Sequence, residues 1–396
     1  MRCVGTVVRG IRTPIIKEDT NLASTVIDSL MKAKESEGFE FRNKDIIAIT
    51  EAVVGISEGN YVTVDNISQD VSIKFKDKEV GLVFPILSRN RFSMILKGIA
   101  RAMNKITILL SFPSDEVGNG IMDENILENS KYNLASIISE KEYYETFGNF
   151  IHPFTGINMV DFYKELVENE NCQVEFVFSN NPQDILKYTN NVINCDIHTR
   201  YKTNETLKKY GANIYGLYEI MNQPINNSGY NEEFGLLGSN KATEDKLKLF
   251  PKTGKTLVKE IQDKMYELTN KKIEVMVYGD GAFKDPVGKI WELADPVVSP
   301  AYTDGLIGTP NELKLKYLSD NKYDNLRGED LKEAIKKEIK SKDSNLTGNM
   351  LSQGTTPRRL IDLIGSLCDL TSGSGDKGTP VVYIQGYFDN YANEEE

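Results

Sequence analysis

The chain has 396 residues and a formal net charge of −11, with 40% hydrophobic and 27% charged residues. This length exceeds one usual compact core, so we expect two or three structural units. The acidic balance disfavours nucleic-acid binding, which needs a basic surface, although a local group of cations and backbone N–H groups still binds phosphate. No apolar run reaches the roughly 18–20 residues that span a bilayer, and the N-terminus lacks the apolar region of a signal peptide. We therefore expect a cytoplasmic protein with no membrane partner.

The first 79 residues predict a strand, a loop, a helix and a second strand. A short apolar run at 4–10 is followed by a Pro-containing loop at 12–21. Residues 22–34 carry apolar side chains at helical spacing, namely Leu22, Val26, Ile27, Leu30 and Met31. Residues 45–50 predict a buried strand, which ends at the polar stretch 51–61.

Residues 80–225 predict an α/β unit. Between two apolar runs, residues 92–103 place Phe92, Ile95, Leu96, Ile99 and Met103 on one helical face. Strands alternating with helices favour a parallel or mixed sheet with crossover connections. The predicted strands are 80–86, 105–112, 173–180 and 192–199.

Residues 226–396 begin with a Gly/Asn-rich stretch and continue with further helices and strands. The helix at 256–268 has an apolar face made of Leu257, Ile261, Met265 and Leu268. It precedes a clear strand at 271–278. Later elements are helices at 329–342 and 358–370 and a final strand at 380–387.

Several familiar kinds of site are disfavoured. The two histidines and four scattered cysteines, without a CxxC pair, argue against a His-rich metal site, a Ser-His-Asp triad and a disulfide framework. The sequence TGKT at 253–256 lacks the first Gly of a phosphate-binding loop, since Leu249 stands there, and is interpreted as the start of a helix. The glycines of SGSGDKG follow a helix and precede a strand, which is the reverse of a dinucleotide fingerprint.

Three loops remain candidates for ligand binding. GDGAFKDP follows a predicted strand, and its Asp280 and Asp285 suit Mg²⁺ or Mn²⁺ while Lys284 offsets phosphate charge, unless the loop is a solvated turn. The Gly-rich loop with Gly375, Asp376 and Lys377 exposes N–H groups, unless it is a plain turn. The third loop, with Arg89, Asn90 and Arg91, precedes a helix N-terminus, a natural anion site, unless it is an exposed connector. Arg358 and Arg359 also begin a helix and indicate an anionic partner.

Five segments occur in an order that resembles the coenzyme F-420:L-glutamate ligase family. They are TPIIKEDTNLAST, DIIAITEAVVGISEGN, GLLGSN at 235–240, TLVKEIQDKMYELTNKKIEVMVYGD and DKGTPVVYIQG. The resemblance implies a mixed α/β (α+β) fold. Its ligase-like domain is built from both chain ends, residues 1–79 and 226–396, and residues 80–225 form an inserted α/β unit. It also implies a homodimer.

The family implies a ligase that joins L-glutamate, or a similar amino acid, to a small-molecule acid through an acyl phosphate, using GTP or ATP and Mg²⁺ or Mn²⁺. By resemblance, Asp280 binds metal. From their residue types and loop positions, we expect Asp376 to bind metal and Lys284 and Asp285 to act in catalysis. The remaining residues, some by resemblance and the others by loop position, are expected to bind nucleotide or substrate: Thr13, Pro14, Ile15, Ile16, Glu58, Gly59, Arg89, Asn90, Arg91, Ser239, Asn240, Lys241, Gly375 and Lys377.

The chain departs from the family pattern at three positions. The family's Ser and Lys fall on Gly55 and Ile56, and its metal-binding Asp falls on Leu237. Arg89 and Arg91 of the insert are candidate replacements for the lost charge. The acid acceptor is a deazaflavin, a folate-like acid or another acid. Two alternatives stay open, namely a non-catalytic ligand sensor and a phosphatase or kinase that uses Asp280 and Asp285.

Overall fold

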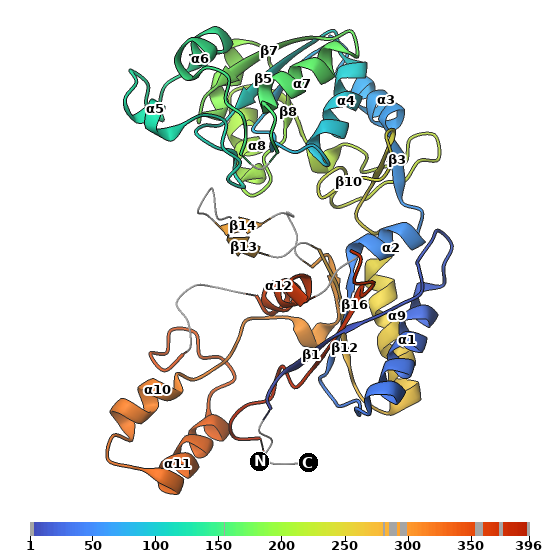
Figure 1. Ribbon diagram of the computed structural model, residues 1–396, viewed down its shortest axis with the longest axis vertical. Helices are drawn as coiled ribbons and strands as arrows, with labels where there is room; N and C mark the ends of the chain where they lie inside the picture. Colours follow the sequence, from blue (N-terminus) through green and yellow to red (C-terminus); the bar gives the residue numbers. More distant parts are fainter. Residues whose placement is uncertain are drawn as a thin grey trace.

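The computed structural model describes residues 4–153, 155–279, 282–284, 291–293, 299–352, 359–371 and 375–393. Two principal sheets, one of five strands and one of six, form two units that follow each other along the long axis of the molecule (Figure 1). Helices pack on both, which confirms the mixed α/β fold. No helix in these ranges combines the length and apolar character that crossing a bilayer requires.

The five-stranded sheet is built from both ends of the chain. Its order is β1 (Val7–Ile11), β16 (Val381–Gln385), β2 (Ile46–Thr50), β12 (Glu274–Tyr278) and β15 (Ala301–Tyr302). β2 and β12 are parallel, and the other pairs are antiparallel. Every residue of β2, β12 and β16 is buried, which explains why these strands are mostly apolar in the sequence, with one polar residue at one end of each.

Helices cover both faces of this sheet (Figure 1). α1 (Leu22–Glu37) and α9 (Gly254–Thr269) pack on one face, and α12 (Leu360–Thr371) packs on the other. Asn21 begins α1 by accepting the Ser24 N–H, and Gly38 ends it with φ 67°. Leu268, expected on the buried face of α9, is instead 59% exposed in the last turn of the helix, although helical spacing places it on the side of Leu257 and Ile261.

The six-stranded sheet is doubly wound. Its order is β6 (Ile138–Ser139), β7 (Gln173–Phe178), β5 (Lys105–Leu110), β4 (Glu79–Val83), β8 (Asn191–Asn194) and β9 (Asn213–Gly216), and all pairs except β6–β7 are parallel. One face packs against α3 (Val64–Lys74), α4 (Phe92–Ala102) and α7 (Met159–Glu168). The other packs against η1 (Pro182–Lys187) and α8 (Arg200–Lys209).

A small sheet joins the two units. It pairs β10 (Asn240–Lys241), β11 (Lys246–Lys248) and β3 (Tyr61–Thr63). The core of the six-stranded unit includes side chains from 62–75 and 217–250 as well as from the middle of the chain. Packing thus crosses positions 79 and 225, and the domain limits drawn from the sequence stay a prediction.

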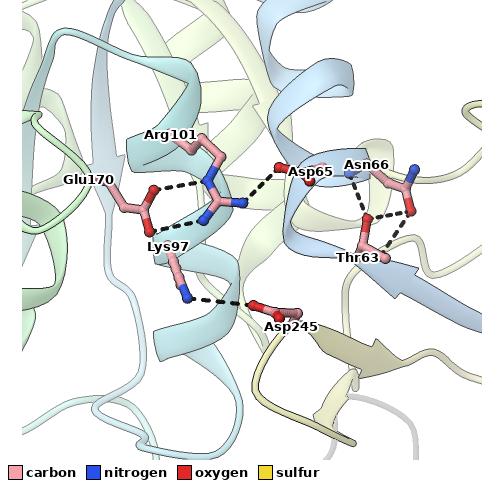
Figure 2. A network of polar contacts seen from close by, with 7 residues as sticks. All are labelled: Thr63, Asp65, Asn66, Lys97, Arg101, Glu170 and Asp245. Carbon is pink, nitrogen blue, oxygen red and sulfur yellow. Dashed lines mark hydrogen bonds and ion pairs between the residues drawn. The ribbon is translucent and has the colours of Figure 1, made fainter.

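The polar contacts in Figure 2 lie mainly within the six-stranded unit. Arg101 of α4 donates to Asp65 of α3 at 2.6 Å and to Glu170, ahead of β7, at 2.8 and 3.1 Å. Lys97 lies 3.7 Å from the largely exposed Asp245, next to β11. Arg101 therefore joins α4 to α3 and to the segment before β7.

Several elements were not predicted from the sequence. The polar stretch after β2 forms the helix α2 (Glu51–Ser57) and then β3. The other unpredicted helices are α3, α5 (Glu124–Glu128), α6 (Glu140–Phe147), α7, α8 and the short α10 (Leu315–Tyr317) and η4 (Leu318–Lys322). The predicted α11 (Gly328–Ser341) lies with α10 away from both sheets (Figure 1). The remaining elements are η2 (Leu217–Glu219), β13 (Ala282–Lys284), β14 (Trp291–Leu293) and η3 (Asp304–Leu306).

Candidate functional site

Four loops meet at one edge of the five-stranded sheet. The parallel strands β2 and β12 both end there, and the antiparallel register brings the end of β1 and the start of β16 to the same edge. The Thr13 N–H donates to Gly378 O at 3.3 Å, and the Thr50 N–H donates to Pro380 O at 2.9 Å. Because ligands of α/β folds collect beyond the carboxyl ends of strands, we treat this edge as the candidate site.

The first loop holds the predicted nucleotide residues Thr13, Pro14, Ile15 and Ile16. Its neighbour across the edge is the loop with Gly375, Asp376 and Lys377, which is exposed to solvent. Ile15 is 88% exposed. The structure therefore brings these two predicted segments together and leaves their side chains accessible, while their ligand roles stay predictions.

Glu58 and Gly59 hold backbone segments together. The Glu58 carboxylate accepts N–H groups from Lys252 at 2.7 Å and Thr253 at 3.0 Å, and also accepts the Thr253 hydroxyl. Glu58 thus stabilises the N-terminus of α9, as an acidic group does at the positive end of a helix dipole. This start of α9 at Gly254 confirms that TGKT begins a helix. Gly59 has φ 60°, and a Cβ there would lie 2.5 Å from Glu18 Oε1.

A row of three side chains crosses the small sheet. Lys248 of β11 lies directly opposite Tyr61 of β3 and Asn240 of β10, so the three project from the same face. This face is turned toward α2, because a Cβ on Gly55 would lie 3.2 Å from Lys248 Cδ. Burial raises the pKa of Tyr61, and the nearby Glu18 carboxylate raises it further. The predicted Asn240 is therefore beside the candidate site.

Lys248 forms a buried ion pair at this edge. Its Nζ lies 3.0 and 3.2 Å from the two carboxylate oxygens of Glu51, the first residue after β2, and the side chains are 8% and 6% exposed. Neither residue was predicted from the sequence as part of a site. The available signal was the alternation Lys246-Leu247-Lys248-Leu249, which is typical of a strand with one polar face.

The loop with Arg89, Asn90 and Arg91 reaches the same region from the six-stranded unit. The Lys241 N–H donates to Asn90 O at 2.7 Å, which places the loop beside β10. Ser88 Oγ accepts the N–H groups of Asn90 and Arg91 at 3.3 and 3.1 Å. Lys241 Nζ pairs with Glu244 at 2.7 Å. The two predicted segments, 89–91 and 239–241, are therefore neighbours.

Ser239 directly precedes β10 and is 1% exposed. Its hydroxyl has no hydrogen-bond partner within the described ranges. Leu237, the departure from the family pattern in this segment, is 2% exposed and belongs to the core of the six-stranded unit. An apolar core position cannot supply a metal ligand, so the carboxylate of the family pattern has no counterpart at Leu237.

A cavity of about 300 Å³ opens at the N-terminus of α9. Its lining includes Tyr230, Glu233, Lys252, Lys255 and Ala301. Ala301 pairs with Val277 near the carboxyl end of β12, so the cavity belongs to the same edge. The lining is of mixed charge, because Glu232 and Glu233 accompany the two lysines and Lys255 Nζ lies 3.7 Å from Glu233.

The candidate metal site falls largely outside the described residues. Asp280 and Asp285 lie outside them, and only the backbone of Lys284, in β13, is described. The β13–β14 hairpin lies between the two units (Figure 1). Within the described ranges, no three His, Cys, Asp or Glu side chains are grouped as metal ligands, and Asp376 is exposed.

Arg359, where an anionic partner was expected, pairs within its own helix. Its guanidinium forms two hydrogen bonds of 2.9 Å with Asp362, one turn along α12. The Arg359 side chain is still 59% exposed, so an anionic partner there stays a prediction; Arg358 lies outside the described residues. Burial raises the pKa of Cys172 to about 11 and raises that of Cys195 and Cys368 further, which fits buried, unreactive thiols.

Comparison with known proteins agrees with this geometry. The family model described as F420-0:Gamma-glutamyl ligase matches residues 10–386. No curated protein matches the chain. The extent of the family match supports a γ-glutamyl ligase type of function. The chain therefore belongs to the F420-0:gamma-glutamyl ligase family.

Proposed function

We propose that the protein is a nucleotide- and divalent-metal-dependent amide ligase. It joins L-glutamate, or a similar amino acid, to a small-molecule acid through an acyl phosphate. The observation that carries this proposal is the meeting of four loops at the carboxyl edge of β2 and β12 in a member of the γ-glutamyl ligase family. GTP is the first nucleotide to test and ATP the second.

The chemistry explains which groups such a site needs. The acid carboxylate takes the terminal phosphoryl group of the nucleotide, the amine then attacks the activated carbonyl, and inorganic phosphate leaves. Negative charge on phosphate oxygens must be offset throughout. The cations near this edge include Lys252 and Lys255 at the cavity and Arg89 and Arg91 beside β10.

The metal requirement rests on Asp280 and Asp285, which suit a hard cation. A bound Mg²⁺ or Mn²⁺ would supply Lewis-acid stabilisation of phosphate charge. The small-molecule acid has one family-based candidate, the deazaflavin precursor, and a folate-like acid is the second candidate.

The test is phosphate release that requires both an acid and an amine. Purified protein is incubated with GTP or ATP, Mg²⁺ or Mn²⁺, glutamate and a panel of acids, and amide products are identified by mass spectrometry. An acid labelled with ¹⁸O in its carboxylate should transfer one label to phosphate, since the acyl phosphate links the two. Nucleotide binding without turnover would instead indicate a sensor, and phosphate release without an amine would indicate a phosphatase or kinase.

A further inference from the structure

We propose that Lys248 is a phosphate-binding cation of the ligase site and that Glu51 is the residue that positions it. This inference rests on the proposed function, because it names the group that meets the nucleotide's terminal phosphate. Neither residue belongs to a site predicted from the sequence. Both side chains of the pair are buried.

One N–H group of the Lys248 ammonium has no acceptor within the described ranges. It has three N–H groups, and its two hydrogen bonds within the described ranges both go to Glu51. At 8% exposure the side chain has little water to satisfy the third. A buried N–H group without an acceptor is costly, and a phosphate oxygen would supply one.

A contribution to folding stability does not by itself explain why Lys248 and Glu51 form a buried ion pair. Taking two charges out of water costs about as much as their attraction returns, and apolar residues of similar size often serve equally well. A buried pair at the carboxyl edge of β2 therefore points to a functional role.

The residues around Lys248 favour the binding of an anion. The segment 51–60, which contains α2, carries no Lys or Arg, so α2 brings no cation to the edge. Gly55 leaves the space through which Lys248 enters, since a Cβ there would lie 3.1 Å from Leu249 O and 3.2 Å from Lys248 Cδ. The Lys248 side chain therefore extends from β11 past Gly55 of α2 to this edge.

Neighbouring groups complete the arrangement. Asn240, on the same face as Lys248, offers an amide, and the next residue is joined to the Arg89–Arg91 loop through Asn90 O. In the bound state Lys248 would keep Glu51 on one side and contact a phosphate oxygen on the other. No bond is made or broken by Lys248, so no proton or electron balance is involved.

The experiment measures nucleotide affinity, without acid or amine, by calorimetry with GTP or ATP and Mg²⁺. Lys248→Met removes the ammonium but keeps the stem, and should weaken binding about 10- to 100-fold, the loss expected for a charged hydrogen bond. Lys246→Met removes an exposed lysine on the same strand and should change affinity by less than about 2-fold.

A charge exchange separates a ligand-binding role from a structural one. The double variant Glu51→Lys with Lys248→Glu restores an ion pair and should recover the melting temperature lost by either single variant. It should not recover nucleotide affinity, because the ammonium then projects from α2. Wild-type affinity in this folded double variant, or in Lys248→Met, would overturn the assignment.

The result for the ligase proposal can be separated from the result for Lys248. If the wild type binds nucleotide but forms no amide, the ligase proposal fails while the affinity comparison still decides the role of Lys248. If the wild type binds neither GTP nor ATP, both proposals are overturned.

Discussion

At the scale of single residues, burial decides which polar groups have unusual properties. Asp45, at the opposite end of β2 from the candidate site, is 1% exposed. Its carboxylate accepts the Arg42 N–H at 2.7 Å and the Tyr383 hydroxyl. Burial raises its pKa from 3.8 to about 6, although the Tyr383 hydrogen bond acts in the opposite direction. Asp45 is therefore a carboxyl group whose proton is held more tightly in the folded state.

Asp45 should make stability depend on pH in a weakly acidic window. Because its folded pKa exceeds its unfolded pKa, the stabilising effect of the proton is complete below about pH 4 and is lost as pH rises through about 6. The free energy of unfolding should fall by about 3 kcal/mol over this window from this group alone. Urea unfolding of the wild type and Asp45→Asn from pH 4 to 7 measures the difference. A constant difference across that range would contradict the assignment.

Glu58 should contribute to stability through α9. Glu58→Ala removes the acceptor of two N–H groups and one hydroxyl at the helix N-terminus, and should lower the free energy of unfolding by about 1–2 kcal/mol. Glu260→Ala on the same helix removes only an exposed pair with Lys264 and should cost less than about 0.5 kcal/mol. Equal losses in denaturant unfolding would show that Glu58 does not stabilise the helix start.

At the scale of elements, side-chain hydrogen bonds join the loops at the place in the six-stranded sheet where the strand order reverses. The strand order reverses between β4 and β8, where doubly wound sheets usually bind ligands. Here Asp115 accepts the Leu87 N–H at 2.8 Å, and Glu116 accepts the N–H groups of Ile197 and His198 at 2.5 and 2.9 Å. These carboxylates hold the loops after β4, β5 and β8 together. The unit therefore serves as a rigid support for the Arg89–Arg91 loop.

Arg101 should couple helix α4 of that unit to α3 and to the segment before β7. Arg101→Met removes hydrogen bonds to Asp65 and Glu170 and should lower the free energy of unfolding by about 1 kcal/mol, a modest value because the guanidinium is 33% exposed. Lys141→Met breaks an exposed pair with Glu145 and should have no measurable effect. A double-mutant cycle of Arg101 with Glu170 gives the coupling, and a coupling near zero would refute the role of this pair.

At the scale of the whole molecule, the candidate site draws on both units. The five-stranded sheet supplies the edge, the small sheet supplies Lys248 and Asn240, and the six-stranded unit supplies the Arg89–Arg91 loop. A ligand held by all of these segments should stabilise the molecule as a unit. The expected homodimer stays a prediction, which light scattering after gel filtration would test.

Nucleotide and metal together should raise the melting temperature. A ligand at about 100 times its dissociation constant adds roughly 2.7 kcal/mol to the free energy of unfolding. The shift with GTP or ATP should require Mg²⁺ or Mn²⁺, disappear with EDTA and be lost in Asp280→Ala. EDTA should also abolish amide formation. A full nucleotide shift in the presence of EDTA would contradict a metal-dependent site.

The sequence alone determined the local elements and the fold class. Buried strands such as β2, β12 and β16 are mostly apolar in the sequence, and α1, α4 and α9 have apolar residues at helical spacing, because side-chain burial is periodic along the chain. The order of the motifs was enough to indicate the family, which the match over 10–386 confirms. Short polar-faced helices such as α2 and α8 were missed because their stability comes from contacts made elsewhere.

Only the tertiary structure decided which groups meet. Glu51 and Lys248 are far apart in the sequence, and Glu58 reaches the start of α9 across a similar separation. No local pattern encodes such pairs, because they depend on strand register and on the path of the chain between sheets.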